Sequence, residues 1–322
     1  MHPRIVDEIA VDADWRGNFV LARETVGPAN SRDLQRLATA GVLIRLVRGV
    51  YVRADVWAAL DPVERHIWLL RAVLLLRERR LVFAYRSAAA IWGLPLLGPP
   101  PEDAHTVTDR SGGGRSDDRL VRHCVDRPST AVVIGALELT PLARTVIDVA
   151  LGPSFPEAVM MADAALAGLD VPVLGRVSVS RHELRSELPP PGSRGVARAR
   201  RVVEFADGRA GSPMESGSRA SIATAGLSMP ELQHEFRDAE GRMFTDFWWS
   251  RWGIAGEMDG RSKYLDPRYR NGRTLEQVLL DEKHREARLR RLPEVKDVVR
   301  WGSDVALSPR RLGALLRSAG VC

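Results

Sequence analysis

The stretch Arg242-Met-Phe-Thr-Asp-Phe-Trp-Trp-Ser-Arg-Trp-Gly-Ile-Ala-Gly-Glu-Met-Asp259 contains two strand-like runs on either side of a short turn. The runs are Arg242–Trp249 and Gly253–Asp259, and both are rich in aromatic and apolar residues. Residues 250–253 form a four-residue connection that ends in glycine, which is a usual length for a β-hairpin loop. The stretch therefore predicts an antiparallel hairpin.

Pairing the two runs about this turn places three acidic side chains on one face of the hairpin. Asp246 falls opposite Glu257, and Asp259 shares the face of Glu257 because alternate residues of a strand point the same way. Directly opposed side chains have Cβ atoms about 4.5–5.5 Å apart, so like charges there repel each other. The cluster predicts a bound cation, and Mg²⁺ is the natural candidate because it takes oxygen ligands from carboxylates and phosphate.

A second interpretation of the same hairpin stays open. Opposed acids on a solvated edge hairpin tolerate each other in a medium of high dielectric constant, with no ion between them. The predicted register is also sensitive to a slip of one residue, which would move Asp246 to the other face.

The composition predicts a globular protein of more than one domain. A chain of 322 residues with 45% hydrophobic content is long enough for two or three packed domains. The longest apolar stretch, Ile67–Leu76, is interrupted by Arg71 and too short to span a bilayer, and residues 1–13 contain no apolar signal-peptide core. We therefore expect a cytoplasmic protein without a membrane partner. The two cysteines, Cys124 and Cys322, give no disulfide framework.

The charge balance permits nucleic-acid binding without requiring it. The net charge is +6 and the pI about 9.9. Of 47 basic residues only Lys263, Lys283 and Lys296 are lysines, as a GC-rich coding bias would produce, so the abundance of arginine says little about function. Lys263 follows the acidic hairpin directly.

Residues 1–60 predict a winged helix-turn-helix DNA-binding domain. A short helical pattern over Phe19–Gly27 precedes a second one over Arg32–Ala40, for which Asn30 or Ser31 is the N-cap. Residues 42–47 and 50–52 then form a two-stranded wing.

In such a domain the second helix enters the major groove, and the wing contacts phosphate or the minor groove. The residues expected to contact double-stranded DNA are Ser31, Arg32, Gln35 and Arg36 on the helix, and Arg45, Arg48 and Arg53 on the wing. An ordinary small α/β module with a solvated charged face is the alternative, because residues 1–60 carry eight arginines against seven acids.

Residues 61–187 predict an α/β middle domain of unknown role. Helical patterns cover residues 62–79, 87–92, 141–151 and 156–167, and strand-like runs cover 81–84, 104–108, 120–125 and 130–134. Four histidines show no paired ligand spacing and are expected to be structural or exposed: His66, His105, His123 and His182. A Pro- and Gly-rich segment then opens a linker and basic helix over residues 188–211.

Residues 212–322 predict the order helix, strands, helix, strand, helix. Four short motifs in this region resemble the Vsr-like endonuclease domains of the PD-(D/E)xK nuclease superfamily: Ser212-Pro-Met-Glu-Ser216, Pro230-Glu-Leu-Gln233, Asp246-Phe-Trp and Gly256-Glu-Met-Asp-Gly260. The resemblance implies an α/β nuclease fold in which Asp246 and Glu257 hold Mg²⁺ or Mn²⁺. It also implies that Glu215 completes the acidic site and that Gln233 lines it.

The chain departs from the superfamily pattern at one position. That pattern puts a lysine two residues after the second acid, where this chain has Asp259. Lys263 lies four residues further on and is expected to reach the site from there. Otherwise Asp259 acts as a metal ligand, or the site is catalytically silent.

The N-terminal run from Ser31 to Tyr51 is similar to the winged-helix domain of AbiEi-type antitoxins. That similarity implies autorepression of an operon and a nucleotidyltransferase-like toxin as a partner.

Together these patterns predict an α/β multidomain protein that binds DNA and hydrolyses its phosphodiesters with Mg²⁺. The alternative is an AbiEi-type antitoxin and transcriptional autorepressor with a catalytically silent nuclease-like domain. A third hypothesis, a protein-binding wing with an RNA-directed C-terminal domain, finds no aromatic stacking platform in the sequence to support it.

Overall fold

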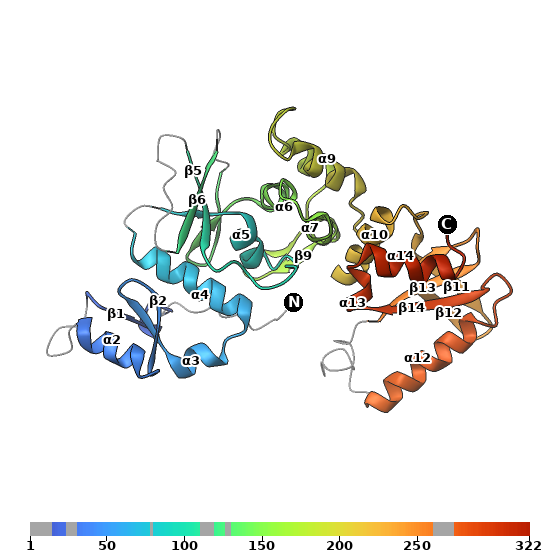
Figure 1. Cartoon of the computed structure of the whole chain (residues 1–322), viewed down its shortest axis with the longest axis horizontal. Helices are drawn as coiled ribbons and strands as arrows, with labels where there is room; N and C mark the ends of the chain where they lie inside the picture. The colour runs from blue at the N-terminus through green and yellow to red at the C-terminus, as the bar shows by residue number, and fades with distance from the viewer. Residues whose placement is uncertain (1–14, 24–30, 78–79, 110–118, 126–129, 260–273) are drawn as a thin grey trace. The chain divides into compact units, whose positions relative to one another are not determined.

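The computed structural model describes residues 15–23, 31–77, 80–109, 119–125, 130–259 and 274–322 (Figure 1). The chain divides into two compact units. The first contains Met1–Gly152 and Gly168–Arg200, and the second contains Pro153–Ala167 and Arg201–Cys322. α9 (Val196–Phe205) includes the residues at which the chain passes from the first unit to the second. Both units mix helices with sheets, so the predicted α/β class is confirmed.

A three-stranded sheet with helices begins the first unit. Its strands are β1 (Phe19–Leu21), β2 (Leu43–Val47) and β3 (Val50–Arg53), in the order β1-β3-β2. The helices are η1 (Trp15–Asn18), α2 (Ser31–Thr39) and α3 (Ala54–Ala59). Leu34 of α2 packs on Leu43 and Tyr51 of the two hairpin strands, which holds the helix against the sheet.

The predicted helix over Phe19–Gly27 is wrong where the structure describes it. Phe19–Leu21 is strand β1, paired antiparallel with β3 from Phe19↔Val52 to Leu21↔Val50. The apolar run Phe-Val-Leu buries its first and third residues, which is the alternation of a strand. The helix over residues 32–40 and the hairpin after it are confirmed as α2, β2 and β3.

A five-stranded mixed sheet in the order β6-β5-β4-β8-β7 lies in the rest of the first unit, which also contains a separate two-stranded antiparallel sheet of β9 and β10. A capping box between Asp61 and Glu64 starts the helix before it, because each side chain accepts a hydrogen bond from the other residue's backbone N–H. The elements are α4 (Pro62–Leu75), β4 (Val82–Phe83), α5 (Tyr85–Trp92), β5 (Ala104–Asp109), β6 (Leu120–Val125), β7 (Val132–Ile134), β8 (Leu137–Leu139), α6 (Leu142–Ala150), β9 (Leu169–Val171), β10 (Gly175–Val177) and α8 (Arg181–Ser186).

A four-stranded sheet in the order β11-β12-β13-β14 is the centre of the second unit. The first three strands pair antiparallel, whereas β13 and β14 pair parallel. The elements are α7 (Phe155–Ala167), α10 (Pro213–Thr224), β11 (Glu231–Asp238), β12 (Gly241–Trp249), β13 (Ile254–Asp259), α12 (Leu275–Leu289), β14 (Asp297–Gly302), α13 (Ser303–Ala306) and α14 (Pro309–Ser318).

Helices cover both faces of this sheet (Figure 1). On one face Phe247 and Trp301 pack with Ile222 of α10 and Leu312 of α14. On the other face Trp248 and Ala255 pack with Leu289 of α12. The sheet is therefore the middle layer of three, and each face of β13 has its own covering helices.

A buried ion pair ties α7 to α10 within the second unit. Arg219 Nη1 donates to Asp163 Oδ2 at 2.6 Å, and both side chains are almost fully buried. Asp163 also accepts the backbone N–H of Asp207 at 2.6 Å. The predicted helix over residues 156–167 thus exists, and the structure groups it with the C-terminal sheet.

None of the helices in the described ranges is both long enough and apolar enough to cross a membrane.

Candidate functional site

The acidic hairpin has the register that the sequence predicts. β12 pairs with β13 at Phe247↔Gly256, Trp248↔Ala255 and Trp249↔Ile254. The ladder ends at Phe247↔Gly256, so Asp246 lies one residue beyond its last pair. Trp248 and Ala255 face α12, and strand alternation puts Glu257 and Asp259 on that same face.

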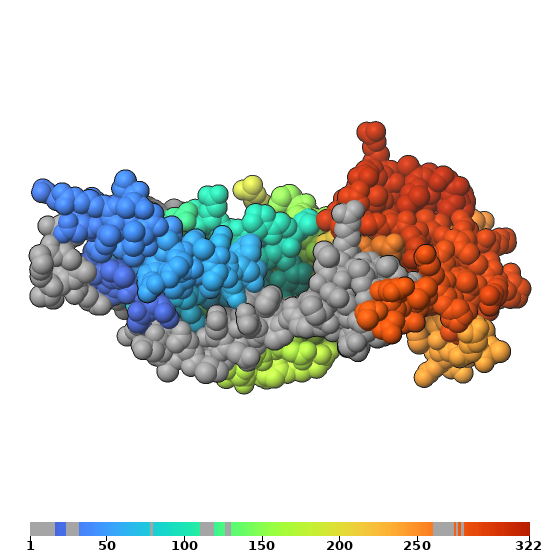
Figure 2. Space-filling view, turned by 90° about the horizontal axis from the view of Figure 1, so that it is seen from below, coloured from blue at the N-terminus to red at the C-terminus, as the bar shows by residue number. Residues whose placement is uncertain are grey.

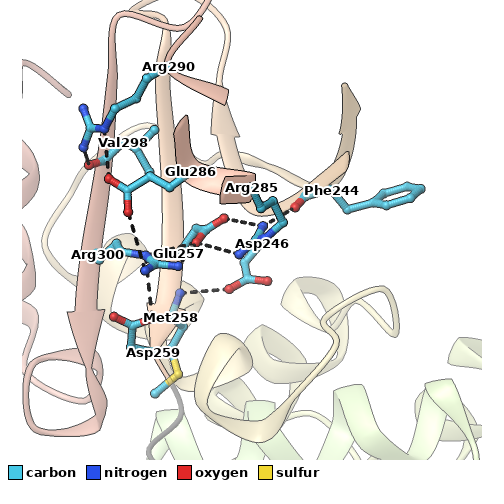
Figure 3. A network of polar contacts seen from close by, with 10 residues as sticks. All are labelled: Phe244, Asp246, Glu257, Met258, Asp259, Arg285, Glu286, Arg290, Val298 and Arg300. Carbon is cyan, nitrogen blue, oxygen red and sulfur yellow. Dashed lines mark hydrogen bonds and ion pairs between the residues drawn. The ribbon is translucent and has the colours of Figure 1, made fainter. Parts of the chain in front are cut away.

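Glu257 is buried and is held by two arginines from different elements (Figure 3). Arg285 of α12 forms a two-point contact, with Nη1 at 2.6 Å from Oε1 and Nη2 at 2.9 Å from Oε2. Arg300 of β14 lies beside Glu257 in the parallel ladder and donates to Oε2 from Nη2 at 2.5 Å and from Nε at 3.1 Å. Each oxygen of the Glu257 carboxylate thus already accepts at least one N–H from a guanidinium.

The two arginines extend this network to further charges. Arg300 lies 3.7 Å from Asp259 Oδ1 and 3.6 Å from Glu286 Oε2. Burial disfavours the Arg300 charge, but the hydrogen bond to Glu257 and the neighbouring carboxylates raise the pKa of Arg300 above its usual value. Glu286 also accepts from Arg290 Nε at 2.9 Å. Acidic and basic side chains therefore alternate through the network.

Asp246 is fixed by the backbone of the neighbouring strand. Its Oδ2 accepts the N–H of Met258 at 2.8 Å (Figure 3). The side chain is half-buried. The structure thus places Asp246 and Glu257 on neighbouring strands, each one residue beyond the last pair of the β12–β13 ladder.

Glu215 and Gln233 contact each other. Glu215 lies in the first turn of α10 and is buried, and its Oε2 accepts from Gln233 Nε2 at 2.9 Å and from the Gly211 N–H at 2.7 Å. The β11–β12 register passes from Leu232↔Phe247 to His234↔Thr245, which places Gln233 across from Asp246. Gln233 has a left-handed backbone with φ of +51°, a conformation that is uncommon outside glycine and often marks functional positions.

The acidic side chains of the hairpin, as they stand, do not fit a bound metal ion. No three histidine, cysteine or acidic side chains in the described ranges are placed to hold one ion. The Glu257 oxygens predicted as ligands already accept hydrogen bonds from Arg285 and Arg300, whose charges repel a divalent cation. Lys263, the predicted catalytic lysine, lies outside the described residues. The guanidinium groups of Arg285 and Arg300 lie beside Glu257, at the place where the sequence pattern predicts Mg²⁺ or Mn²⁺.

The arginines at this site are the residues that sequence reasoning missed. Arg300 lies on β14 and Arg285 on α12, both distant from the hairpin in sequence. No local sequence pattern predicts either contact, because the parallel pairing that sets Arg300 beside Glu257 is a feature of the tertiary structure.

The predicted DNA-contacting residues lie on α2 and the β2–β3 hairpin. Figure 2 shows atoms of the N-terminal part of the first unit, in blue, at the surface of the molecule. Exposed side chains on α2 and the hairpin are Arg32, Gln35, Arg36, Arg45, Arg48 and Arg53. Ser31 begins α2, and its side chain lies outside the description. Arg36 and Arg53 lie beside acidic side chains: Arg36 Nη1 is 3.2 Å from Asp33, and Arg53 donates to both oxygens of Asp55. These two pairs reduce the positive charge that the surface offers.

A second cluster of chemically active side chains lies on the five-stranded sheet. His105 of β5 and His123 of β6 contact each other, with His123 Nε2 at 3.0 Å from His105 Nδ1. The Tyr85 ring stacks on His123 with centroids 3.9 Å apart. Ser87 Oγ accepts the backbone N–H of His105 at 3.0 Å and lies 2.9 Å from His66 Nε2. Sequence spacing did not predict this cluster, because its members come from four separate elements.

Burial shifts the pKa values of several groups near this cluster. Burial, and to a smaller extent the neighbouring His105, lowers the pKa of His66 and of His123 to about 4. Burial raises the pKa of Asp148 to about 6, although its partner Arg144 acts in the opposite direction. Arg144 Nε lies 2.7 Å from Asp148 Oδ1. The two imidazoles are therefore neutral at pH 7.

Comparisons with known proteins give relatives without an assigned activity. No family model matches the chain. Two curated proteins of Mycobacterium tuberculosis, the uncharacterized protein MT2308 of strain CDC 1551 and the uncharacterized protein Rv2248 of strain H37Rv, are each 32% identical to it over 189 residues. The match covers 56% of this chain and 61% of each relative, so the chain spans about three fifths of the length of these curated relatives.

Proposed function

We propose that the protein is a regulator that binds double-stranded DNA, and that its nuclease-like C-terminal unit does not cleave the DNA. The absence of cleavage is proposed because Arg285 and Arg300 both donate hydrogen bonds to the Glu257 carboxylate, the predicted metal ligand. DNA binding is supported by α2 and the β2–β3 hairpin, which carry exposed arginine and glutamine side chains and follow each other in the order of a recognition helix and a wing.

The electrostatics of Glu257 support a site without a metal. Bidentate guanidinium–carboxylate contacts are among the stronger hydrogen-bonded pairs in proteins. A divalent cation at Glu257 would have to displace Arg285 or Arg300 and would then lie beside a second positive charge. Asp259 at the superfamily's lysine position removes a further group on which cleavage depends. Both features point away from phosphodiester hydrolysis.

A Mg²⁺- or Mn²⁺-dependent endonuclease is the second candidate. The feature in its favour is the Glu215–Gln233 pair, because Gln233 holds a left-handed backbone across the sheet from Asp246. Strained backbones gather at functional sites, and this one lies among the predicted catalytic residues. A nucleotidyltransferase-like toxin partner stays a prediction of the antitoxin resemblance.

One experiment separates the two candidates. Purified full-length protein is incubated with supercoiled plasmid and Mg²⁺ or Mn²⁺, beside Glu257→Ala, and DNA binding is followed in parallel. We expect binding without nicking by either protein. Nicking by the wild type that Glu257→Ala abolishes would overturn the regulator and establish the endonuclease. A wild-type protein that neither binds nor nicks DNA would overturn both the regulator and the endonuclease.

A second variant makes the negative result informative. Arg285→Ala/Arg300→Ala frees Glu257 of both guanidinium groups. If the arginines alone silence the site, this variant gains metal-dependent nicking that Glu257→Ala in the same background removes. If it stays inactive while folded, Asp259 in place of lysine accounts for the silence.

A further inference from the structure

We propose that His105 and His123 form a binding site for a transition-metal ion of the Zn²⁺ class on the five-stranded sheet. This site belongs to the first unit and is independent of the acidic hairpin and of the proposed DNA binding. Its two protein ligands are His105 Nδ1 and His123 Nε2, which face each other at 3.0 Å.

The sheet positions both imidazoles before any ion arrives. β5 and β6 pair parallel at His105↔Val121 and Val107↔His123, so the two histidines lie on neighbouring strands and on one face. The backbone N–H of His105 donates to the Ser87 hydroxyl at 3.0 Å, which fixes this part of β5 against α5. Both histidines are half-buried, so an ion reaches them from solvent.

The distance between the two nitrogens suits a shared ion. Zn²⁺ binds imidazole nitrogen at about 2.0–2.1 Å, so two tetrahedral ligands lie about 3.3 Å from each other. The two nitrogens, 3.0 Å apart in a hydrogen bond, must separate by a few tenths of an ångström, and the rings must turn so that both lone pairs point at the ion. Imidazole suits Zn²⁺, Cu²⁺ and Ni²⁺, whereas Mg²⁺ prefers oxygen ligands.

Binding requires a change of tautomer and no loss of charge. In the imidazole pair one facing nitrogen carries an N–H and the other offers its lone pair. When the donor ring moves its proton to its outer nitrogen, both facing nitrogens present lone pairs to the ion. Water completes the coordination, because the described residues provide only these two ligands.

Tyr85 supplies an independent indication that this place is specialised. Its backbone is left-handed, with φ of +54°, which is rare for a bulky aromatic residue. Its ring lies 3.9 Å from the His123 ring at an interplanar angle of 30°. The strained backbone thus holds a ring that fixes the plane of one ligand, as preorganised sites require.

The test is a calorimetric titration of the full chain with Zn²⁺. The starting protein carries Cys124→Ser and Cys322→Ser, because both cysteines are exposed and thiolates also bind Zn²⁺. We expect one equivalent to bind in the micromolar range, and His105→Ala or His123→Ala to weaken binding by about tenfold or more. His182→Ala, in the exposed part of α8, is the matched control and leaves the affinity unchanged.

Two further measurements keep the outcome decisive. Circular dichroism checks that each variant is folded, and His105→Gln and His123→Gln replace the alanines if one is not. Zn²⁺ raises the Tm of the starting protein and of His182→Ala, but not of the His105 and His123 variants. Equal affinity in all variants, or no binding by the starting protein, would overturn the site and leave a hydrogen-bonded histidine pair.

Discussion

Arg285 Nη1 and Glu257 Oε1 lie 2.6 Å apart, although 28 residues separate them in the chain. The pair joins α12 to the central strand β13, and the same guanidinium donates to the backbone oxygen of Phe244 on β12 at 2.9 Å. Arg285 therefore connects a helix to two strands and neutralises the most buried acid of the hairpin.

Removing Arg300 destabilises the second unit. Arg300→Ala leaves Glu257, which is almost fully buried, with one guanidinium instead of two. We expect a loss of about 1–3 kcal/mol in the free energy of unfolding, the usual effect of removing a partner from a buried charged hydrogen bond. Urea denaturation measures it. Arg311→Ala is the matched control, because Arg311 and Asp304 form an exposed pair that contributes at most about 1 kcal/mol. Equal midpoints for the two variants would contradict the prediction.

Gly256 is required by close packing of aromatic rings. A Cβ at this position would lie 2.8 Å from Trp301 Cη2 and 2.9 Å from Trp249 Cζ3. Gly256→Ala should lower the free energy of unfolding by about 1–3 kcal/mol, the cost of overpacking a core. Thermal unfolding followed by tryptophan fluorescence tests it. Ser250→Ala, in the exposed turn, should stay within about 0.5 kcal/mol of the wild type. An unchanged Tm for Gly256→Ala would show that the rings move apart.

His66 makes the first unit sensitive to acid. Burial lowers the pKa of His66 to about 4 from its ordinary 6.5, so the unfolded chain binds more protons between these values. Stability from this group is complete above pH 6.5 and falls as the pH drops towards 4, by about 3 kcal/mol. Asp148, whose pKa burial raises to about 6, acts in the opposite direction below pH 6.

Unfolding measured from pH 7 to pH 4 tests this dependence with two variants. His66→Gln should flatten the loss of stability towards acid, whereas Asp148→Asn should steepen it below pH 6. Parallel curves for His66→Gln and the wild type would exclude His66 as the titrating group.

Of the two wing residues Arg45 and Arg53, Arg45 should contribute more to DNA affinity. Arg45 is exposed, whereas both oxygens of Asp55 accept hydrogen bonds from Arg53. Arg45→Ala should weaken binding and reduce the slope of log K against log salt by about 1, the effect of one lost phosphate contact. Arg53→Ala should have a smaller effect. Fluorescence anisotropy at several salt concentrations measures both. The wing assignment fails if Arg45→Ala leaves both quantities unchanged.

The sequence alone predicted the local elements of the C-terminal unit well. Alternation of apolar and polar residues, a glycine-bearing turn and helix caps are signals within a few residues, and they located β12, β13, α10 and α14. The hairpin register followed from the turn, which is why Trp249↔Ile254 could be predicted. The helix expected over Phe19–Gly27 failed because three apolar residues fit a strand equally well, and only pairing with β3 decides between them.

Tertiary structure decided what surrounds the acids. Composition and spacing predicted a positive charge beside Glu257, but not whether a metal or a side chain provides it. Packing of α12 on one face of the sheet and the parallel pairing of β14 deliver Arg285 and Arg300 to that place. The same holds for His105 and His123, which meet only because β5 and β6 are neighbours. Contacts between distant segments depend on how strands order and helices pack, and a local pattern of residues carries no record of either.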